Sequence, residues 1–355
     1  MGEVFGGKTE AVLSICIPTY NFGAFIGETL ESIACQDLSG AEIVILDSAS
    51  TDDTPAVVAG FTSRLPNLRY IRADRKNGID RDMARVVEEA RGEYVWLFSA
   101  DDIMRPGAVA AVARELSPDI DVVLCSHTIC DREMRFLFDY PVLRAPSGAV
   151  FDLGSAGSRH DYFARAANTE AFFSFMSGVI VKRETWRSVP LNEMFVGSCW
   201  AHVARLFEVI VRYGLRVRYI GGPLLDKRGD NDSFAAASTA ERWCLSIAGY
   251  SDIVAASFGA HSIEALHVRR VLRVEFPLMS FVSLRYISVR LGVPQETALV
   301  DDLCLRLHGP ARGNWRWLIY RAFALIPADF LKGLGRMLDA TGTKGILRWL
   351  MQRLT

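Results

Sequence analysis

Short apolar runs alternate with helical patterns over the first third of the chain. Strands are predicted at residues 12–17, 42–46, 68–72, 93–98 and 121–126. Between them, apolar residues recur every three or four positions, as in Met83, Val86, Val87 and Ala90, which is typical of a helix packed on a sheet. This alternation predicts an α/β fold with an open, mainly parallel mixed sheet flanked by helices.

Polar residues follow three of these predicted strands at the point where each ends. They are Thr19, Tyr20 and Asn21, then Asp47, Ser48 and Ser50, then Ser99, Asp101 and Asp102. In open α/β sheets, ligands bind beyond the carboxyl ends of the strands. The pattern therefore predicts a binding site on one rim of the sheet.

The adjacent carboxylates of Asp101 and Asp102 repel each other unless a cation or a basic group offsets them. A hard divalent cation completed by substrate phosphate oxygens is one solution. The alternative is an acidic pair at the start of the helix that Pro106 opens, where the helix dipole favours negative charge. From these residues alone, both interpretations stay open.

Asp47 follows the second strand and can accept hydrogen bonds from a nucleobase edge or a ribose hydroxyl. The competing interpretation is local turn chemistry, because residues 47–54 are rich in Asp, Ser and Thr, which form side-chain turns.

Three blocks, at residues 13–21, 42–52 and 92–102, together resemble the inverting family-2 glycosyltransferases in order and spacing. The resemblance covers about the first 125 residues and implies a GT-A (Rossmann-like) fold, a nucleotide-diphosphate-sugar donor and a divalent cation, Mn²⁺ or Mg²⁺. It implies that Thr19, Tyr20 and Asp47 contact the nucleoside, and that Asp101, with Asp102 beside it, is the metal-binding acid. The chain departs from the usual Asp-x-Asp motif at Ser99, which removes one acidic group.

We extend the predicted donor site to neighbouring residues of the matched blocks, namely Pro18, Asn21, Ser50, Ser99 and Ala100. Three blocks in the middle of the chain, at residues 172–178, 196–202 and 228–234, are similar to the abequosyltransferase-like branch. That similarity implies transfer of a dideoxyhexose or related sugar to a lipid-linked O-antigen unit, a step of lipopolysaccharide biosynthesis.

An inverting transfer needs a base that deprotonates the acceptor hydroxyl. The Glu-Asp pair of most family-2 enzymes is missing, and His202 stands in its place, with a side chain that titrates near neutrality. A partly buried structural histidine is the alternative, and Asp161, Glu193 and Asp232 are rival bases. The predicted acceptor contacts are Trp200, which could stack on a sugar face, Asn231 and Asp232.

Lys227 and Arg228 are predicted on a loop after a strand at residues 216–220. Arginine binds phosphate oxygens with two nitrogens, so this loop could close over the donor diphosphate, with Arg81 as a further contact. A solvated basic turn is the alternative.

The composition argues against a protein that spans a membrane and against one that binds nucleic acid. Half of the 355 residues are hydrophobic and 23% are charged, and no uncharged apolar run approaches the roughly eighteen residues of a membrane-spanning helix. No secretory signal is recognised, and seven cysteines without a CxxC pair suit a reducing cytoplasm. The net charge of -1 argues against nucleic acid as a partner.

Residues 311–355 carry eight Lys or Arg and two Asp, a charge of +6, interleaved with aromatic and aliphatic residues. Basic amphipathic helices of this kind lie in the interface of anionic membranes. We therefore expect a peripheral protein on the inner face of the cytoplasmic membrane. A helical cap or dimer contact is the alternative.

The expected organisation is a nucleotide-sugar-binding half at residues 1–126, an acceptor-binding and catalytic half at 127–234, and a helical region at 235–355. Two other functions stay open. A sugar nucleotidyltransferase would have a Gly-rich basic loop after the first strand, where this chain has Pro18 to Gly23. A non-catalytic nucleotide-sugar-binding or scaffold protein would explain Ser99 and the missing Glu-Asp pair.

Overall fold

The computed structural model describes residues 12–231, 238–309, 316–327 and 329–330. The chain divides into two compact units: the first is Met1–Asp232 with Ala256–Phe258, and the second is Ser233–Ala255 with Gly259–Thr355. The two predicted halves at residues 1–126 and 127–234 both contribute strands to the same sheet of the first unit.

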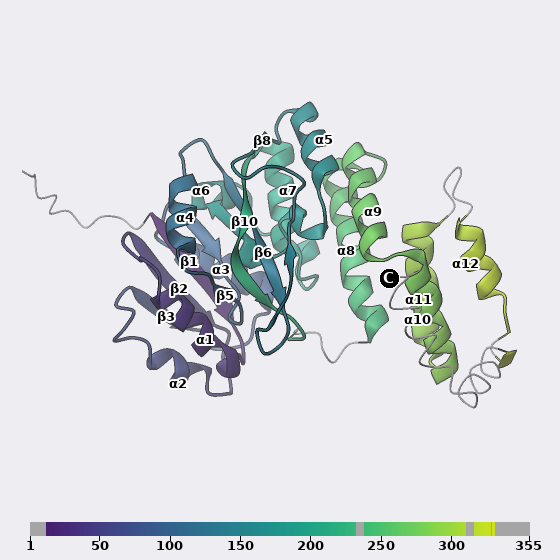
Figure 1. Ribbon diagram of the computed structural model, residues 1–355, viewed down its shortest axis with the longest axis horizontal. Helices are drawn as coiled ribbons and strands as arrows, with labels where there is room; N and C mark the ends of the chain where they lie inside the picture. The colour runs from purple at the N-terminus through teal and green to yellow at the C-terminus, as the bar shows by residue number, and fades with distance from the viewer. Residues whose placement is uncertain (1–11, 232–237, 310–315, 328, 331–355) are drawn as a thin grey trace, which may run out of the picture. The chain divides into compact units, whose positions relative to one another are not determined.

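That sheet has ten strands, with a path of eight in the order β3-β2-β1-β4-β9-β6-β10-β5. Figure 1 labels several of them, among them β1, β2, β3, β6 and β10. Their bounds are β1 Leu13–Thr19, β2 Ala41–Asp47, β3 Leu68–Arg72, β4 Tyr94–Leu97, β5 Ile103–Met104, β6 Val122–Cys130, β9 Val179–Lys182 and β10 Arg216–Arg228. Off this path, β7 (Phe136–Tyr140) pairs with β6, and β8 (Val150–Asp152) pairs with β10. Strands β1 to β4 pair in parallel, whereas β9 runs antiparallel to β4 and β6. The predicted mixed α/β sheet is confirmed.

Helices cover both faces of the sheet. On one face lie α1 (Gly23–Ala34) and α4 (Ala108–Glu115), and α2 (Thr54–Ala59) packs on α1. On the other lies α3 (Ile79–Glu89), which contacts β1, β2 and α7 (Ala201–Tyr213). The first unit also contains α5 (Ala156–Arg165), α6 (Arg183–Arg187) and the short 3-10 helices Thr169–Phe172, Met176–Gly178 and Glu193–Phe195.

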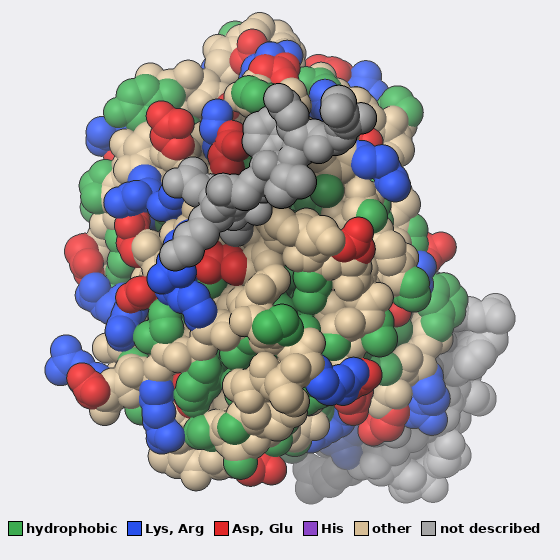
Figure 2. All heavy atoms as spheres, turned by 90° about the vertical axis from the view of Figure 1, so that its left-hand side faces the viewer, with side chains coloured by type: hydrophobic (Ala, Val, Ile, Leu, Met, Phe, Trp, Pro, Cys, Tyr) green, Lys and Arg blue, Asp and Glu red, His purple; other side chains and the backbone are tan. Residues whose placement is uncertain are grey.

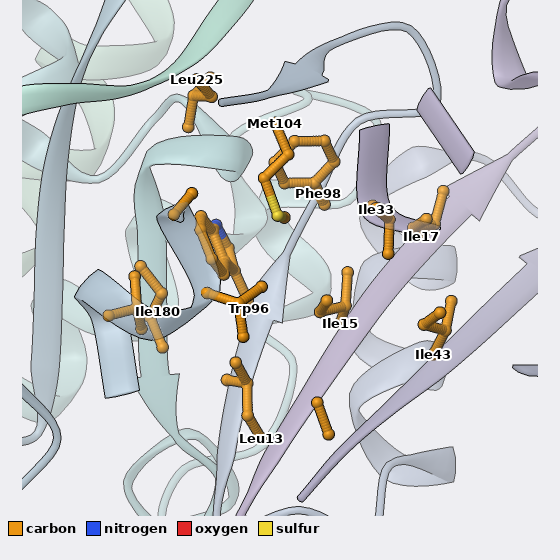
Figure 3. Packing of buried hydrophobic residues seen from close by; sticks show 14 of the residues in the cluster. Leu13, Ile15, Ile17, Ile33, Ile43, Trp96, Phe98, Met104, Ile180 and Leu225 are labelled. Carbon is orange, nitrogen blue, oxygen red and sulfur yellow. The ribbon is translucent and has the colours of Figure 1, made fainter. Parts of the chain in front are cut away.

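The central strands are buried on both faces. Ile15 and Ile17 of β1 belong to one cluster with Ile33 of α1 and with Trp96 and Phe98 from the end of β4 (Figure 3). Between them, the Cys16 thiol faces α3 and donates to the carbonyl of Val86 over 3.7 Å. Strands buried on both faces need continuous apolar runs, which is why the sequence pattern identified them.

The parallel register brings the polar strand ends together. Thr19 pairs with Asp47 across β1 and β2, and Cys16 of β1 pairs with Leu97 of β4. The residues after Leu97, including Asp101 and Asp102, therefore emerge at the same rim as Thr19 and Asp47. This rim is the carboxyl end of the parallel strands, as the sequence predicted.

Strand β10 is longer than its apolar pattern predicts. The sequence ended this strand at Ile220, before two glycines and a proline, but the strand continues to Arg228 through register shifts between Ile220 and Pro223 and between Pro223 and Asp226. The bulges accommodate these residues without ending the pairing with β6. The prediction that Lys227 and Arg228 lie on a loop is therefore wrong.

The second unit is helical in its described residues, which confirms the helical C-terminal region. Its helices are α8 (Thr239–Phe258), whose last residues belong to the first unit, α9 (Ile263–Glu275), α10 (Leu278–Leu291), α11 (Pro294–His308) and α12 (Arg316–Ala324). Ser238 and Glu241 form a capping box at the start of α8, each bonding the other's backbone N–H. None of the helices in the described part of the chain is long and apolar enough to span a membrane.

We predict that Gly92→Ala destabilises the fold. A methyl group at Gly92 would come within 2.7 Å of the Ser14 backbone nitrogen in β1, so β1 and the start of β4 would have to separate. We expect the free energy of unfolding in urea to fall by about 1–3 kcal/mol. Gly157→Ala is the control, because Gly157 is exposed in the first turn of α5 with no atom within 4 Å of the added methyl, and the substitution should not lower stability. Equal stability of the two variants would contradict the close approach.

Candidate functional site

The loops after β1 and β2 are fastened to each other. The backbone N–H of Asn21 donates to Ser50 Oγ over 2.8 Å, and its side-chain oxygen accepts from the backbone N–H of Thr51 over 2.8 Å. Asp52 accepts from the backbone N–H of Gly23 over 2.9 Å. These contacts require Asn21 to adopt a left-handed backbone with φ of 58°, which Asn tolerates better than most residues. The two loops thus form one wall of the rim.

Asp47 anchors this wall from beneath. Its carboxylate is fully buried and accepts the backbone N–H of Ser50 over 2.7 Å and the hydroxyl of Tyr70 in β3. Arg72 donates to the Ser50 carbonyl over 2.7 Å. Asp47 therefore shapes the wall through Ser50, and the sequence did not single out Tyr70 or Arg72 as its supports.

The segment before α3 contacts both of the loops that form this wall. Lys76 Nζ lies 4.0 Å from the centre of the Tyr20 ring, and the backbone N–H of Asn77 donates to Ser48 Oγ over 3.0 Å. The Thr19 hydroxyl is buried at the end of β1 and has no hydrogen-bond partner among the described residues. Tyr20 and Thr19 thus lie where the sequence placed them, at the rim.

Asp101 is held between two polar side chains. One carboxylate oxygen accepts from the Ser99 hydroxyl, and the other accepts from the Asn231 amide over 2.8 Å. Ser99 thus stands where the usual motif has a first carboxylate and donates a hydrogen bond to Asp101. The structure brings together Ser99, Asp101 and Asn231, which the sequence placed in one site, whereas Asp232 lies outside the described residues.

Asp102 turns inward. Its carboxylate accepts the Ser177 hydroxyl over 2.6 Å and the backbone N–H of Arg228 over 3.1 Å, and the residue is 2% exposed. Burial, followed by the negative charge of Asp101, raises the pKa of Asp102 to about 7. Asp102 therefore fastens the motif to β10 and to the segment before β9, and Asp101, at 8% exposed, is the less deeply buried of the two acids.

The side chains of this motif can hold a hard cation only if a substrate supplies further ligands. Among the described residues, no group of three or more His, Cys, Asp or Glu side chains is placed to hold a metal ion. Mg²⁺ and Mn²⁺ bind through one or two carboxylates when substrate phosphates and water complete the shell. Asp101, whose oxygens keep further lone pairs, fits that role.

The predicted basic contacts are engaged with acids. Arg228 is buried and donates to Glu28 over 2.7 Å and to the Asp101 carbonyl over 3.0 Å, while Arg81 forms a two-nitrogen ion pair with Glu193. Lys227 bonds Glu170 over 2.7 Å. In the view of Figure 2, acidic and basic side chains are likewise interspersed. Arg228 thus supports the backbone of the motif, and the charge of Lys227 acts on Asp102 in the direction that lowers its pKa.

His202 is 4% exposed, and its Nε2 lies 3.1 Å from the Ser174 carbonyl. Burial lowers its pKa, so the ring is held neutral. This placement in α7 favours a structural role, and general base catalysis by His202 stays a prediction. Trp200 precedes α7 with its ring 6.2 Å from that of His202. Asp161 is exposed and paired with Arg165.

A buried cluster beside the motif was not found from sequence. His127 of β6 is fully buried, with Nε2 3.1 Å from a Glu170 oxygen, and the other Glu170 oxygen bonds Lys227. Burial lowers the pKa of His127 to about 4, outweighing the attraction of Glu170. His127, Glu170 and Lys227 lie on three separate segments, so no local spacing in the sequence signals them.

Comparison with known sequences shows which family the chain resembles. The family model of Glycosyl transferase family 2 matches residues 14–159. The abequosyltransferase RfbV of Salmonella typhimurium is 30% identical over 67% of this chain and 73% of its own length. A GalNAc(5)-diNAcBac-PP-undecaprenol beta-1,3-glucosyltransferase of Campylobacter jejuni is 24% identical over 52% of this chain and 56% of its own.

Solved structures share the fold. S. aureus TarS 1-349 in complex with UDP-GlcNAc aligns with a TM-score of 0.57 and 17% identity, over 92% of this chain and 91% of that one. The mannosyltransferase PcManGT of Pyrobaculum calidifontis, in complex with GDP-Man and Mn²⁺, aligns with a TM-score of 0.50 and 18% identity, over 96% and 88%. The expected GT-A type of α/β fold is thereby confirmed.

The buried His127 predicts an acid-sensitive fold. Its folded-state pKa of about 4 lies below the ordinary value near 6.5, so the unfolded chain binds a proton that the folded chain excludes between these values. Stability must therefore fall as pH falls through this window. We expect His127→Gln to reduce the stability lost between pH 7 and pH 5 by about 2 kcal/mol, measured by urea unfolding. The same substitution at the exposed His261 is the control. If His127→Gln leaves the pH dependence of the free energy of unfolding unchanged, His127 is not the cause of the acid sensitivity.

Proposed function

Because the chain belongs to glycosyl transferase family 2, we propose that it moves a sugar from a nucleoside-diphosphate donor to a hydroxyl of a lipid-linked bacterial surface glycan, with inversion at the anomeric carbon. The relatives named as an abequosyltransferase and as an undecaprenol-linked glucosyltransferase support this substrate class. An O-antigen unit is the acceptor that we propose.

The observation that carries the proposal is the rim itself. Asp47 and Thr19 end two parallel strands at its nucleoside side, and Asp101 follows the third, fixed by Ser99 and Asn231. A nucleoside diphosphate needs polar groups around its base and ribose. It also needs a site beside its two phosphates that offsets their negative charge. This arrangement supports a nucleotide-sugar donor, and the complexes of the structural neighbours with UDP-GlcNAc and GDP-Man support it independently.

We assign roles in donor binding to the following residues of the rim. Tyr20 offers a ring face to the base, and Ser50, held by Asp47, offers the polar wall. Asp101 would hold a divalent cation, which when bound offsets the charge that develops on the leaving diphosphate. The Mn²⁺ complex of the mannosyltransferase supports this assignment. Lys227, kept beside Asp102 by Glu170, adds positive charge at the same end.

In the transfer, the acceptor hydroxyl oxygen bonds to the anomeric carbon as the bond from that carbon to the phosphate oxygen breaks. The bonding electrons leave with the nucleoside diphosphate, and the hydroxyl proton passes to a base. We keep His202 as the proposed base, with Trp200 beside it as an acceptor contact. Since the ring is buried with its Nε2 3.1 Å from the Ser174 carbonyl, this role requires Ser174 to move away when the acceptor binds.

We also propose that the C-terminal region contacts an anionic membrane, where a lipid-linked acceptor would lie. Most of residues 311–355 lie outside the described residues. In the described part, Trp317 and Tyr320 are buried within the second unit, whereas Leu318 is 66% exposed and Leu325, just beyond α12, is 77% exposed. Exposed leucines beside basic residues are typical of helices that lie in a membrane interface.

Calorimetric titration with UDP, GDP, CDP and dTDP, each with and without Mn²⁺ or Mg²⁺, tests the donor assignment. We expect one nucleotide to bind tightly, with affinity enhanced by the metal. Asp101→Asn should weaken that metal-enhanced binding roughly ten- to hundredfold, because it removes a charged ligand of the cation. The control is Asp119→Asn, an exposed acid paired with Arg216 at the other end of β10.

If none of the four nucleotides binds, the donor assignment is wrong and a scaffold role is favoured. If one binds but Asp101→Asn and Asp119→Asn behave alike, Asp101 does not hold the metal. Release of the free sugar from the donor in the absence of acceptor, abolished in Asp101→Asn, would distinguish an enzyme from a non-catalytic binding protein.

The membrane proposal predicts that Leu318→Asp, in the full chain, lowers binding to liposomes that contain anionic lipid. Burial of one leucine contributes about 1.5–3 kcal/mol, so the apparent affinity should fall by roughly tenfold or more. Leu305→Asp, which replaces another exposed leucine of the second unit, is the matched control. Equal liposome binding by Leu318→Asp and the unchanged protein would contradict a membrane role for α12.

A further inference from the structure

Strand β7 exposes three consecutive apolar side chains. Phe136 is 60% exposed, Leu137 is 52% exposed and Phe138 is 49% exposed. No other run of three large apolar residues is exposed in the part of the chain that the structure describes. Contiguous exposed apolar surface on a globular protein marks a site of interaction. We name residues 131–140, which comprise β7 and the turn that joins it to β6, the apolar hairpin.

The backbone of β7 is poorly suited to pair with a strand of another protein. Among the described residues, β7 pairs with β6 alone. The register shifts between Ile129, which lies opposite Phe138, and Cys130, which lies opposite Phe136, so Leu137 is the extra residue of a bulge. Bulges interrupt the regular row of backbone groups that a further strand needs. The interaction of β7 must therefore use its side chains, which a lipid surface can take in without pairing with the backbone.

The turn of the apolar hairpin adds positive charge. Its two acids, Asp131 and Glu133, both pair with Arg135, over 2.6 and 3.2 Å. Arg132 lies between these acids in the sequence, is exposed and forms no ion pair with any acid that the structure describes. Asp139, the remaining acid of the hairpin, lies beyond the three apolar residues. An unpaired guanidinium next to apolar side chains complements a bilayer, whose phosphates lie above its acyl chains.

The apolar hairpin is fixed to the candidate site. The buried Arg228 donates from one nitrogen to the carbonyl of Arg132 and from another to the carbonyl of Asp101, the latter over 3.0 Å. The guanidinium groups of Arg132 and Arg228 both lie over the Phe25 ring of α1, 5.6 and 5.1 Å from its centre. One arginine thus joins the turn of the hairpin to the backbone of the metal motif.

We propose that the apolar hairpin is a membrane-docking site, in which Phe136, Leu137 and Phe138 enter the interface of a lipid bilayer and hold the rim of the first unit at the membrane surface. The inference rests on the proposed function for its purpose, because the hydroxyl of a lipid-linked acceptor is reached at that surface. The occupant is the bilayer and not a second protein chain.

The apolar hairpin and residues 311–355 differ in the lipid that they require. The +6 charge of residues 311–355 acts on anionic lipid and is screened by salt. The hairpin contributes mainly apolar contacts, so its binding should persist on zwitterionic lipid and at high ionic strength. The two contacts can therefore be measured separately in the full chain.

Cosedimentation of the full chain with sucrose-loaded phosphatidylcholine vesicles in about 0.5 M NaCl tests the hairpin. We expect the unchanged protein to bind. Phe136→Ser and Phe138→Ser should each lower the partition coefficient by about fivefold or more, because each removes an apolar ring from the interface. Phe136→Leu keeps an apolar side chain and should lower it by about twofold or less.

Val150→Ser is the matched control. Val150 is 39% exposed on β8, which pairs with the start of β10, at the end of that strand away from Arg228. This variant should bind the vesicles as the unchanged protein does. The midpoint of urea unfolding reports whether each variant stays folded, and Leu137→Ser provides an independent variant with the same expectation as the two phenylalanine substitutions.

The outcomes are distinct. Equal binding by the hairpin Ser variants and by Val150→Ser would overturn the proposal, as would a failure of the unchanged protein to bind phosphatidylcholine. A changed oligomeric state of Phe136→Ser in analytical ultracentrifugation, with vesicle binding unchanged, would also overturn it and assign the hairpin to a second copy of the chain. Vesicle binding is measured without nucleotide. If none of the nucleoside diphosphates binds in calorimetry but the hairpin variants lose vesicle binding, the proposed function fails and the membrane-docking site stands.

Discussion

The site depends on the parallel pairing of β1, β2 and β4 with both faces buried. A strand covered by helices on both faces keeps its middle apolar, so its polar residues lie near its two ends. Ser14 and Glu42 bond each other near the starts of β1 and β2, whereas Thr19 and Asp47 end these strands. Parallel pairing then places all of those ends on one side, as the register of Thr19 against Asp47 shows. The burial of Ile15 and Ile17 and the assembly of the rim are thus two results of one constraint.

The second constraint is the cost of burying carboxylates. Asp47, Asp80 and Asp102 are all nearly inaccessible to solvent, and each accepts at least two hydrogen bonds from N–H or O–H groups. A buried charge without such partners would be strongly destabilising. Each of these acids therefore fixes a segment of backbone, which explains why a site built on loops keeps a defined shape.

Local patterns predicted the first half of the fold well. Strands β1, β2 and β4 are largely apolar runs followed by polar residues, and Asp47 and Asp101 could be placed after strands from the sequence. The extent of β10 could not be predicted, because its register shifts lie on either side of Pro223, the first of them at Gly221 and Gly222, and such residues normally end a strand. The partners of Lys227 and Arg228 could not be predicted either, because Glu170 and Glu28 come from other parts of the chain.

By itself, the sequence determined the order of the elements, the family and the acids at the strand ends, because these depend on periodicity and on short matched blocks. Only the tertiary structure decided that Asp102 is more deeply buried than Asp101, that His202 is buried, and that Asp80 bonds the segment before α7. The reason is physical: burial and hydrogen bonding are properties of pairs of segments, and the segments that meet at Asp80 are more than one hundred residues apart.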